Sequence, residues 1–263
     1  MNLFGNRYSK PGPGVSKDEP RKKGVRRFLE VFSRDFRDIV KLNLLFCVCA
    51  APTVILFILG LLGFYSPVAL VLSILAAFPV GGAITANMYC ISKMLYDEPG
   101  FLWHDFKRKF LENIKQAAAP GMLSTAFVYS QIFLWTPLMI DETGMDTVWG
   151  VLGIALLLFF SMVSPYVFIQ IAYVDLKMFP LIKNSILLAI SNVPRSFMGF
   201  LTGGIVWFVF ILFFPVSLVF SPLILLFGFT MSWLLCLMWI WPFFNKHFAV
   251  EETLTGRKAE NDF

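Results

Sequence analysis

Charged residues are scarce in this chain, and they are missing altogether from its long apolar stretches. Only 15% of the 263 residues are Asp, Glu, Lys or Arg, against roughly 25% in a soluble domain. The mean hydropathy is +0.72, and hydrophobic residues make up 57% of the sequence. A water-soluble globule could not bury so much apolar surface, so we expect a membrane protein. The lack of charge also argues against an ion-coupled transporter, which needs ionisable groups at membrane depth.

The residues that carry most catalytic and metal chemistry are also few. The sequence has two His and four Cys, and it contains no CxxC pair, no phosphate-binding GxxxxGKS/T loop, and no HExxH or GxSxG motif. All four cysteines lie in apolar stretches, where we interpret them as small buried residues. We therefore expect no enzyme activity, no cofactor and no metal site.

Six apolar stretches are each long enough to cross a bilayer, which takes about 20 residues. The longest run divides at Ser221-Pro222, because proline disfavours helix at the preceding residue. The predicted fold class is an all-α polytopic membrane protein with six transmembrane helices in three hairpins. The predicted spans are 42–64, 67–90, 117–140, 147–172, 196–220 and 222–244.

The basic residues all fall on one side of this six-span arrangement. The two terminal segments and the connections between spans two and three and between spans four and five hold all 22 Lys and Arg residues. Because such residues near span ends stay on the cytoplasmic side, we expect both termini in the cytoplasm. The bases follow the membrane boundaries, so anionic lipid headgroups explain them better than nucleic acid. The predicted divisions are a disordered basic Pro/Gly tail at 1–24, a six-span membrane domain at 25–248 and a polar cytoplasmic tail at 249–263.

Segments just before the first and third spans place apolar residues at three- and four-residue steps, with charged residues between them, and 181–197 is a weaker copy. This spacing is typical of amphipathic helices, so we expect a cytoplasmic interfacial helix before each hairpin. Aromatic residues would anchor these helices at headgroup level, namely Phe28, Phe32, Phe36, Trp103, Phe106 and Phe110. Basic residues would face anionic headgroups or a docked partner, namely Arg26, Arg27, Lys107, Arg108 and Lys109.

Uncharged polar residues are the candidates for a solute path within the spans. Asn87, Gln131 and Gln170 lie at membrane depth and could line a cavity for a small neutral solute. The alternative, which we favour, is hydrogen bonding between helices. In the same way, residues 79–83, with Pro79, Gly81 and Gly82, could break the second span as at a transporter binding site. We favour a kink with close packing at small residues.

Three stretches resemble the YesL-like family, small bacterial membrane proteins with a domain of unknown function. They are NLLFCVCAAP at 43–52, PVGGAITANMYCISKMLYDE at 79–98 and WHDFKRKFLENIKQ at 103–116, and WPFFNKHF at 241–248 is similar to the family's close. The chain departs from the family in its long Pro/Gly tail and its Cys-rich first span. The resemblance covers most of 43–248. It implies a bacterial plasma-membrane protein linked to carbohydrate-uptake systems of the ABC type, and it supplies no active-site residues.

These observations predict a non-catalytic integral membrane accessory or scaffold protein. We expect its cytoplasmic interfacial helices to dock a partner, a component of a carbohydrate ABC importer. The alternative is a facilitator or channel for a small neutral solute, lined by Asn87, Gln131 and Gln170. Docking needs exposed charged and aromatic side chains on the cytoplasmic side, whereas a channel needs the three amides to meet at one cavity. The sequence leaves the oligomeric state open.

Overall fold

The structure is a computed structural model, and it describes residues 21–62, 67–98, 100–138, 145–213, 219, 221–250 and 252. Within these ranges the chain is helical and contains no strand. The predicted tails at 1–24 and 249–263 lie almost wholly outside the described residues, so the disorder of the first and the cytoplasmic location of the second stay predictions.

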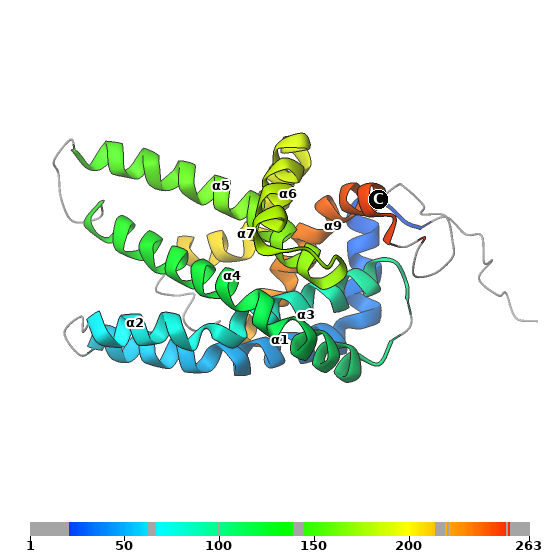
Figure 1. Cartoon of the computed structure of the whole chain (residues 1–263), viewed down its shortest axis with the longest axis horizontal. Helices are drawn as coiled ribbons and strands as arrows, with labels where there is room; N and C mark the ends of the chain where they lie inside the picture. The colour runs from blue at the N-terminus through cyan, green and yellow to red at the C-terminus, as the bar shows by residue number, and fades with distance from the viewer. Residues whose placement is uncertain are drawn as a thin grey trace, which may run out of the picture.

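Six helical stretches are long and apolar enough to cross a membrane, which confirms the prediction of an all-α, multi-pass membrane protein. The end of α1, the start of α2, the end of α4 and the start of α5 lie at one end of the bundle, and the start of α1 and the end of α9 lie at the other (Figure 1). The helices are α1 (Gly24–Leu62), α2 (Pro67–Ala76), α3 (Phe78–Leu95), α4 (Leu102–Leu138), α5 (Met145–Tyr173), α6 (Met178–Ser191), α7 (Val193–Leu212), α8 (Ser221–Leu223), the π-helical turn η2 (Ile224–Gly228) and α9 (Phe229–Phe248).

Two of the predicted spans differ in detail from the observed helices. The second span is divided at Ala77 into α2 and α3, and Pro79 occupies the first turn of α3, where its missing N–H costs no hydrogen bond. The fifth span is shorter than predicted, because α7 ends at Leu212 rather than at 220. The predicted break before the last span is confirmed, since α8 begins at Ser221.

The expected helix before the first span is set off from it, because α1 consists of two helices joined at a kink at Asp35. The first of them, dark blue in Figure 1, runs across the direction of the span. Before the third span no such break occurs, since α4 continues from Leu102 to Leu138. The faces of both segments fail to divide into a buried apolar side and an exposed charged side: Arg27 and Asp105 are buried, whereas Val25 and Leu29 are exposed. Contacts with the end of α3, described below, decide which side chains are buried. Before α7 a separate helix does occur, α6.

The helix α3 lies at the centre of the bundle. It contacts α1, α4, α5 and α9, and every residue from Val80 to Ser92 is buried. The largest side chains that are fully buried in the structure include Trp241, Phe244 and Tyr166, from α9 and α5. A helix buried on all sides fixes the positions of its neighbours, so both ends of α3 are held by the surrounding bundle.

Small residues allow α3 and α4 to approach backbone to backbone. A Cβ added to Gly81 would lie 1.9 Å from the carbonyl oxygen of Ala117, and a Cβ added to Gly121 would lie 2.4 Å from the nitrogen of Gly81. Close contact of this kind at small residues is a common way for membrane helices to associate. The approach supports the close-packing interpretation of residues 79–83.

Asn43 joins the first span to the last through the turn η2. Its Nδ2 donates to the carbonyls of Ile224 (3.2 Å) and Leu225 (2.7 Å), and its Oδ1 accepts from the backbone N–H of Thr230 (2.9 Å). A π turn interrupts the α-helical hydrogen-bond pattern, and the bilayer offers no water to satisfy the freed groups. The fully buried amide of Asn43 takes that role.

Candidate functional site

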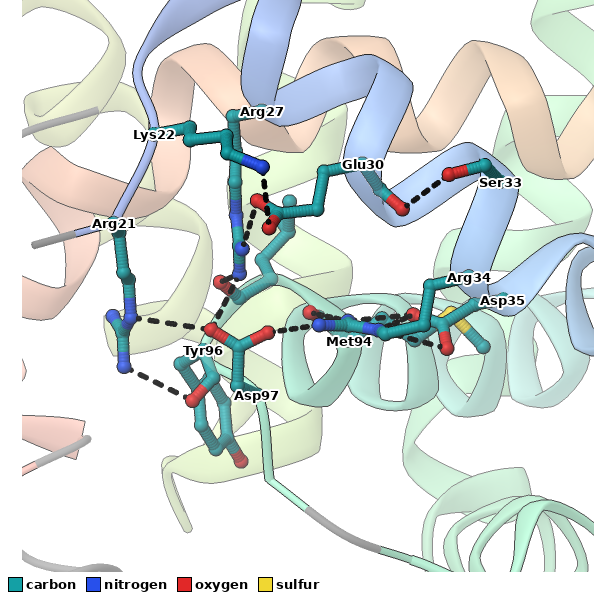
Figure 2. A network of polar contacts seen from close by, with 11 residues as sticks. Arg21, Lys22, Arg27, Glu30, Ser33, Arg34, Asp35, Met94, Tyr96 and Asp97 are labelled. Carbon is teal, nitrogen blue, oxygen red and sulfur yellow. Dashed lines mark hydrogen bonds and ion pairs between the residues drawn. The ribbon is translucent and has the colours of Figure 1, made fainter. Parts of the chain in front are cut away.

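The first turns of α1, the end of α3 and the first turns of α4 meet at one end of the bundle. We call this region, residues 21–41, 93–98 and 100–115, the basic end. Three arginines from the N-terminal part of the chain converge there on one carboxylate that follows α3 (Figure 2). We call these four residues, Arg21, Arg27, Arg34 and Asp97, the arginine clamp.

Both oxygens of Asp97 are engaged in the arginine clamp. Arg27 Nη2 lies 2.8 Å from Asp97 Oδ2, and Arg21 Nε lies 3.5 Å from the same oxygen. Arg34 Nη1 pairs with Oδ1. The clamp therefore fastens the start of α1 to the end of α3, which are distant in sequence.

The clamp lies where it does because a helix C-terminus leaves carbonyls unpaired and carries partial negative charge. Arg34 donates to the carbonyl of Met94 (2.8 Å), Arg27 to that of Leu95, and Arg21 to that of Tyr96 (3.0 Å). The next residue, Asp97, has a φ of 58°, in the left-handed region that Asp tolerates better than most residues. This turn brings its carboxylate among the same three guanidinium groups.

Ionisation in the clamp is stabilised by the pairing of its members. Arg27 is only 2% exposed, and its Nη1 donates to Glu30 Oε2 at 3.0 Å. Burial of Glu30 opposes ionisation, but hydrogen bonds from Arg27 and Lys22 outweigh it and hold the pKa of Glu30 below its ordinary value of 4.5. Hydrogen bonds to Asp35 raise the pKa of Arg34 further. Removing the charge of Glu30 or Asp97 would leave the buried guanidinium of Arg27 with one ion-pair partner fewer, which destabilises the fold.

A second ion pair fixes the start of α4 to α3. Lys93 Nζ lies 2.9 Å from Asp105 Oδ2, and Arg108 Nη2 lies 3.4 Å from Oδ1. Asp105 occupies the first turn of α4, where a carboxylate interacts favourably with the helix dipole. Arg108 also donates to the hydroxyl of Tyr89 (3.2 Å). The basic end is thus held together by paired charges from three helices.

A cavity of about 390 Å³ opens beside the clamp and these pairs. Its wall carries five carboxylates and two bases, and we call it the acidic cavity. The bases are Arg34 and Lys93. The carboxylates are Asp35, Asp38, Asp97, Glu98 and Asp105.

The six predicted aromatic anchors occupy different environments. Trp103 and Phe36 are exposed, and Phe106 is buried in the core, so Phe106 packs inside the protein rather than at the lipid headgroups. Phe28 and Phe32 are half-buried and stack with ring centroids 5.8 Å apart. Phe110, the remaining anchor, is also half-buried and stacks on Phe106.

The five predicted bases also divide into exposed and engaged side chains. Arg27 does not face lipid or a partner as expected, because the end of α3 buries it. Lys109 is half-buried, 3.2 Å from Glu112 and over the ring of Tyr89. The side chain of Arg108 is exposed, but it forms an ion pair with Asp105. Only two of the set are both exposed and without an ion pair among the described residues: Arg26 and Lys107.

Two of the three buried amides, Asn87 and Gln170, bond to their own or neighbouring helices. Asn87 donates to the carbonyl of Ala83 (3.1 Å) and accepts from Thr230 Oγ1 (3.4 Å). Gln170 donates to Ser185 Oγ (2.7 Å). Gln131 is buried on α4. None of the three lines the acidic cavity or the groove described below, and a solute path through them stays a prediction.

Sequence reasoning missed the residues that assemble this site, chiefly Asp97, Lys93 and Asp105. One feature of the sequence could have indicated these contacts. Between two basic segments lies a short acidic stretch, YDEPG at 96–100, which places carboxylates close to many basic residues. Comparisons of the chain with family models, curated proteins and solved structures find no match. The resemblance to the YesL-like family therefore stays a prediction, and the geometry alone has to support a function.

Proposed function

We propose that this protein is a non-catalytic accessory or scaffold protein of the bacterial cytoplasmic membrane, with both termini in the cytoplasm. In this proposal the basic end docks a partner, and the resemblance to the YesL-like family favours a component of a carbohydrate ABC importer. The alternative role, as a facilitator for a small neutral solute, stays a prediction, and none of its three amides lines the acidic cavity.

The observation that carries the proposal is the arginine clamp. It ties α1 to α3 at the basic end, while Lys93 and Asp105 tie α3 to α4. A surface held in place before binding loses little conformational entropy when a partner docks. The exposed Lys107 lies next to these ion pairs on α4, so its charge is presented from a fixed position.

Charge reversal at the exposed base tests the proposal. Lys107→Glu changes the surface without touching a described ion pair, whereas Lys109→Glu would also break the pair with Glu112. Tagged protein would be purified in mild detergent, and co-purified ABC-importer subunits would be measured by quantitative mass spectrometry. We expect importer subunits with the wild type and at least a tenfold loss with Lys107→Glu, since like charges facing each other across an interface cost several kcal/mol.

The matched control is Lys183→Glu on α6, another exposed lysine. It should retain the same subunits as the wild type. Equal recovery with Lys107→Glu would contradict docking at the basic end, and the absence of importer subunits from the wild type would contradict the proposed partner. Orientation has its own test: labelling of Lys107 in intact cells by a membrane-impermeant amine reagent would contradict a cytoplasmic basic end.

A further inference from the structure

A groove of about 640 Å³ runs between α1 and the start of α4. Its wall is mostly apolar, formed by Leu44, Leu45 and Val48 of α1 with Phe101 and Trp103. Val48 is 71% exposed, Trp103 63% and Phe101 84%. The lining of α1 belongs to the first turns of the apolar span, so the groove opens toward the hydrocarbon near the headgroup level, where Trp is enriched. We call it the apolar groove.

The apolar groove is continuous with the acidic cavity. The two share Asp38, Gly100 and Leu102 in their walls. At the junction Lys41 Nζ pairs with Asp38 Oδ1 at 2.9 Å, and both side chains are exposed, so the pair costs little to separate. Within the cavity Glu98 has no ion pair among the described residues. Bases pair with the other four carboxylates of the cavity. One continuous site therefore offers an apolar trough, one lysine at its mouth and a chamber in which Glu98 is not neutralised by a described base.

We propose that this site binds one membrane phospholipid with a primary-amine headgroup, of the phosphatidylethanolamine type. An acyl chain lies in the apolar groove, the phosphate contacts Lys41, and the ammonium group enters the acidic cavity beside Asp38 and Glu98. Each part of the lipid meets its complement: hydrocarbon meets apolar side chains, the phosphate meets an ammonium, and the ammonium meets carboxylates. Asp38 exchanges Lys41 for the lipid amine, and no buried charge loses its partner.

The charges argue against the other common lipids. Phosphatidylglycerol brings no cation for Glu98, the carboxylate of the acidic cavity without a described ion pair, so its phosphate would gain only Lys41. Phosphatidylcholine carries a cation, but its methylated nitrogen has no N–H to donate, and charge-assisted hydrogen bonds are stronger than contact between charges alone. A soluble amine would leave the apolar groove empty.

Native mass spectrometry of the full chain, purified in mild detergent, tests the site. The protein would be given equal amounts of phosphatidylethanolamine, phosphatidylcholine and phosphatidylglycerol with identical acyl chains. We expect one retained phosphatidylethanolamine with roughly tenfold preference over the other two, the ratio given by one additional charge-assisted hydrogen bond. The double variant Asp38→Asn/Glu98→Gln should abolish the preference, and Val48→Trp, which fills the groove, should reduce retention of all three lipids.

Matched controls keep the result interpretable. Glu112→Gln removes an exposed carboxylate of the basic end outside the cavity, and Leu59→Trp enlarges an exposed side chain of α1 outside the groove; both should bind as the wild type does. Equal retention of the three lipids, preference for phosphatidylglycerol, or preference unchanged in the double variant would each overturn the proposal. A dimer that retains no lipid would also overturn it, since a second copy would then cover the groove.

Discussion

The close approach of α3 and α4 makes Gly81 the position where one added methyl group should cost most. In Gly81→Ala the new Cβ would lie 1.9 Å from the carbonyl oxygen of Ala117, whereas ordinary contact begins at 3.4 Å. The backbones would have to separate by about 1.5 Å, the difference between these two distances. The obstacle is backbone in the centre of the bundle, so no side chain can rotate away to relieve the overlap.

Overpacking of this kind costs about 1–3 kcal/mol, and a clash with backbone favours the upper end. At 2–4 °C per kcal/mol for a chain of this size, we expect the melting temperature to fall by roughly 6–12 °C. Unfolding in mild detergent can be followed with a thiol-reactive fluorogenic dye, because Cys90 and Cys236 are buried in the folded protein. Gly121→Ala, which meets the nitrogen of Gly81 at 2.4 Å, should behave similarly.

The control for this prediction is Gly204→Ala in α7. A Cβ there would have nothing within 4 Å, and alanine has the better helix propensity by up to about 1 kcal/mol. Gly204→Ala should therefore melt at or slightly above the wild-type temperature. If Gly81→Ala also melted at the wild-type temperature, the close packing of α3 against α4 would be refuted.

Three further predictions concern the polar contacts. Asn43→Leu removes the hydrogen bonds to Ile224, Leu225 and Thr230. At about 0.6 kcal/mol per bond within a membrane, the free energy of unfolding should fall by roughly 2 kcal/mol. The measurement is a titration with SDS, and an unchanged unfolding midpoint would contradict the role of Asn43. Arg27→Lys keeps the charge but loses the guanidinium fork, so it should melt below the wild type yet above Arg27→Gln. Because the pKa of Glu30 is lowered from 4.5, its contribution to stability is complete above pH 4.5 and is lost as the pH falls through the lowered value; Glu30→Gln should flatten the pH dependence of melting in that range.

Much of the fold could be predicted because the bilayer imposes strong rules on sequence. The six spans follow from length and hydropathy, and the break at Ser221 follows from the conformational restriction that Pro222 imposes. The end of the fifth span could not be predicted, since the residues after Leu212 are as apolar as those before it. The division between α2 and α3 at Ala77 did have a signal, since Pro79 occupies the first turn of α3 and residues 79–83 already indicated a break or kink.

The site was harder to predict because it depends on contacts between distant residues. The spacing of Phe28, Phe32 and Phe36 predicted a helix lying on the membrane, and these three residues do lie in a helix, at the start of α1. The periodicity of one segment cannot show that Arg27 finds its partner at Asp97, which is 70 residues away. A charge that is paired in the structure looks in the sequence like any charge exposed to water.

The bond between Asn43 and η2 has a consequence for how the protein is made. The partners are 181 residues apart or more, so a growing chain inserts its first span long before the carbonyls of that turn exist. Until the last span arrives, the amide of Asn43 lacks these three partners, and within α1 its Nδ2 contacts only Cys47 Sγ (3.7 Å). A chain truncated before residue 224 never supplies these partners, so we expect its first span to be held less firmly in the membrane than that of the full chain.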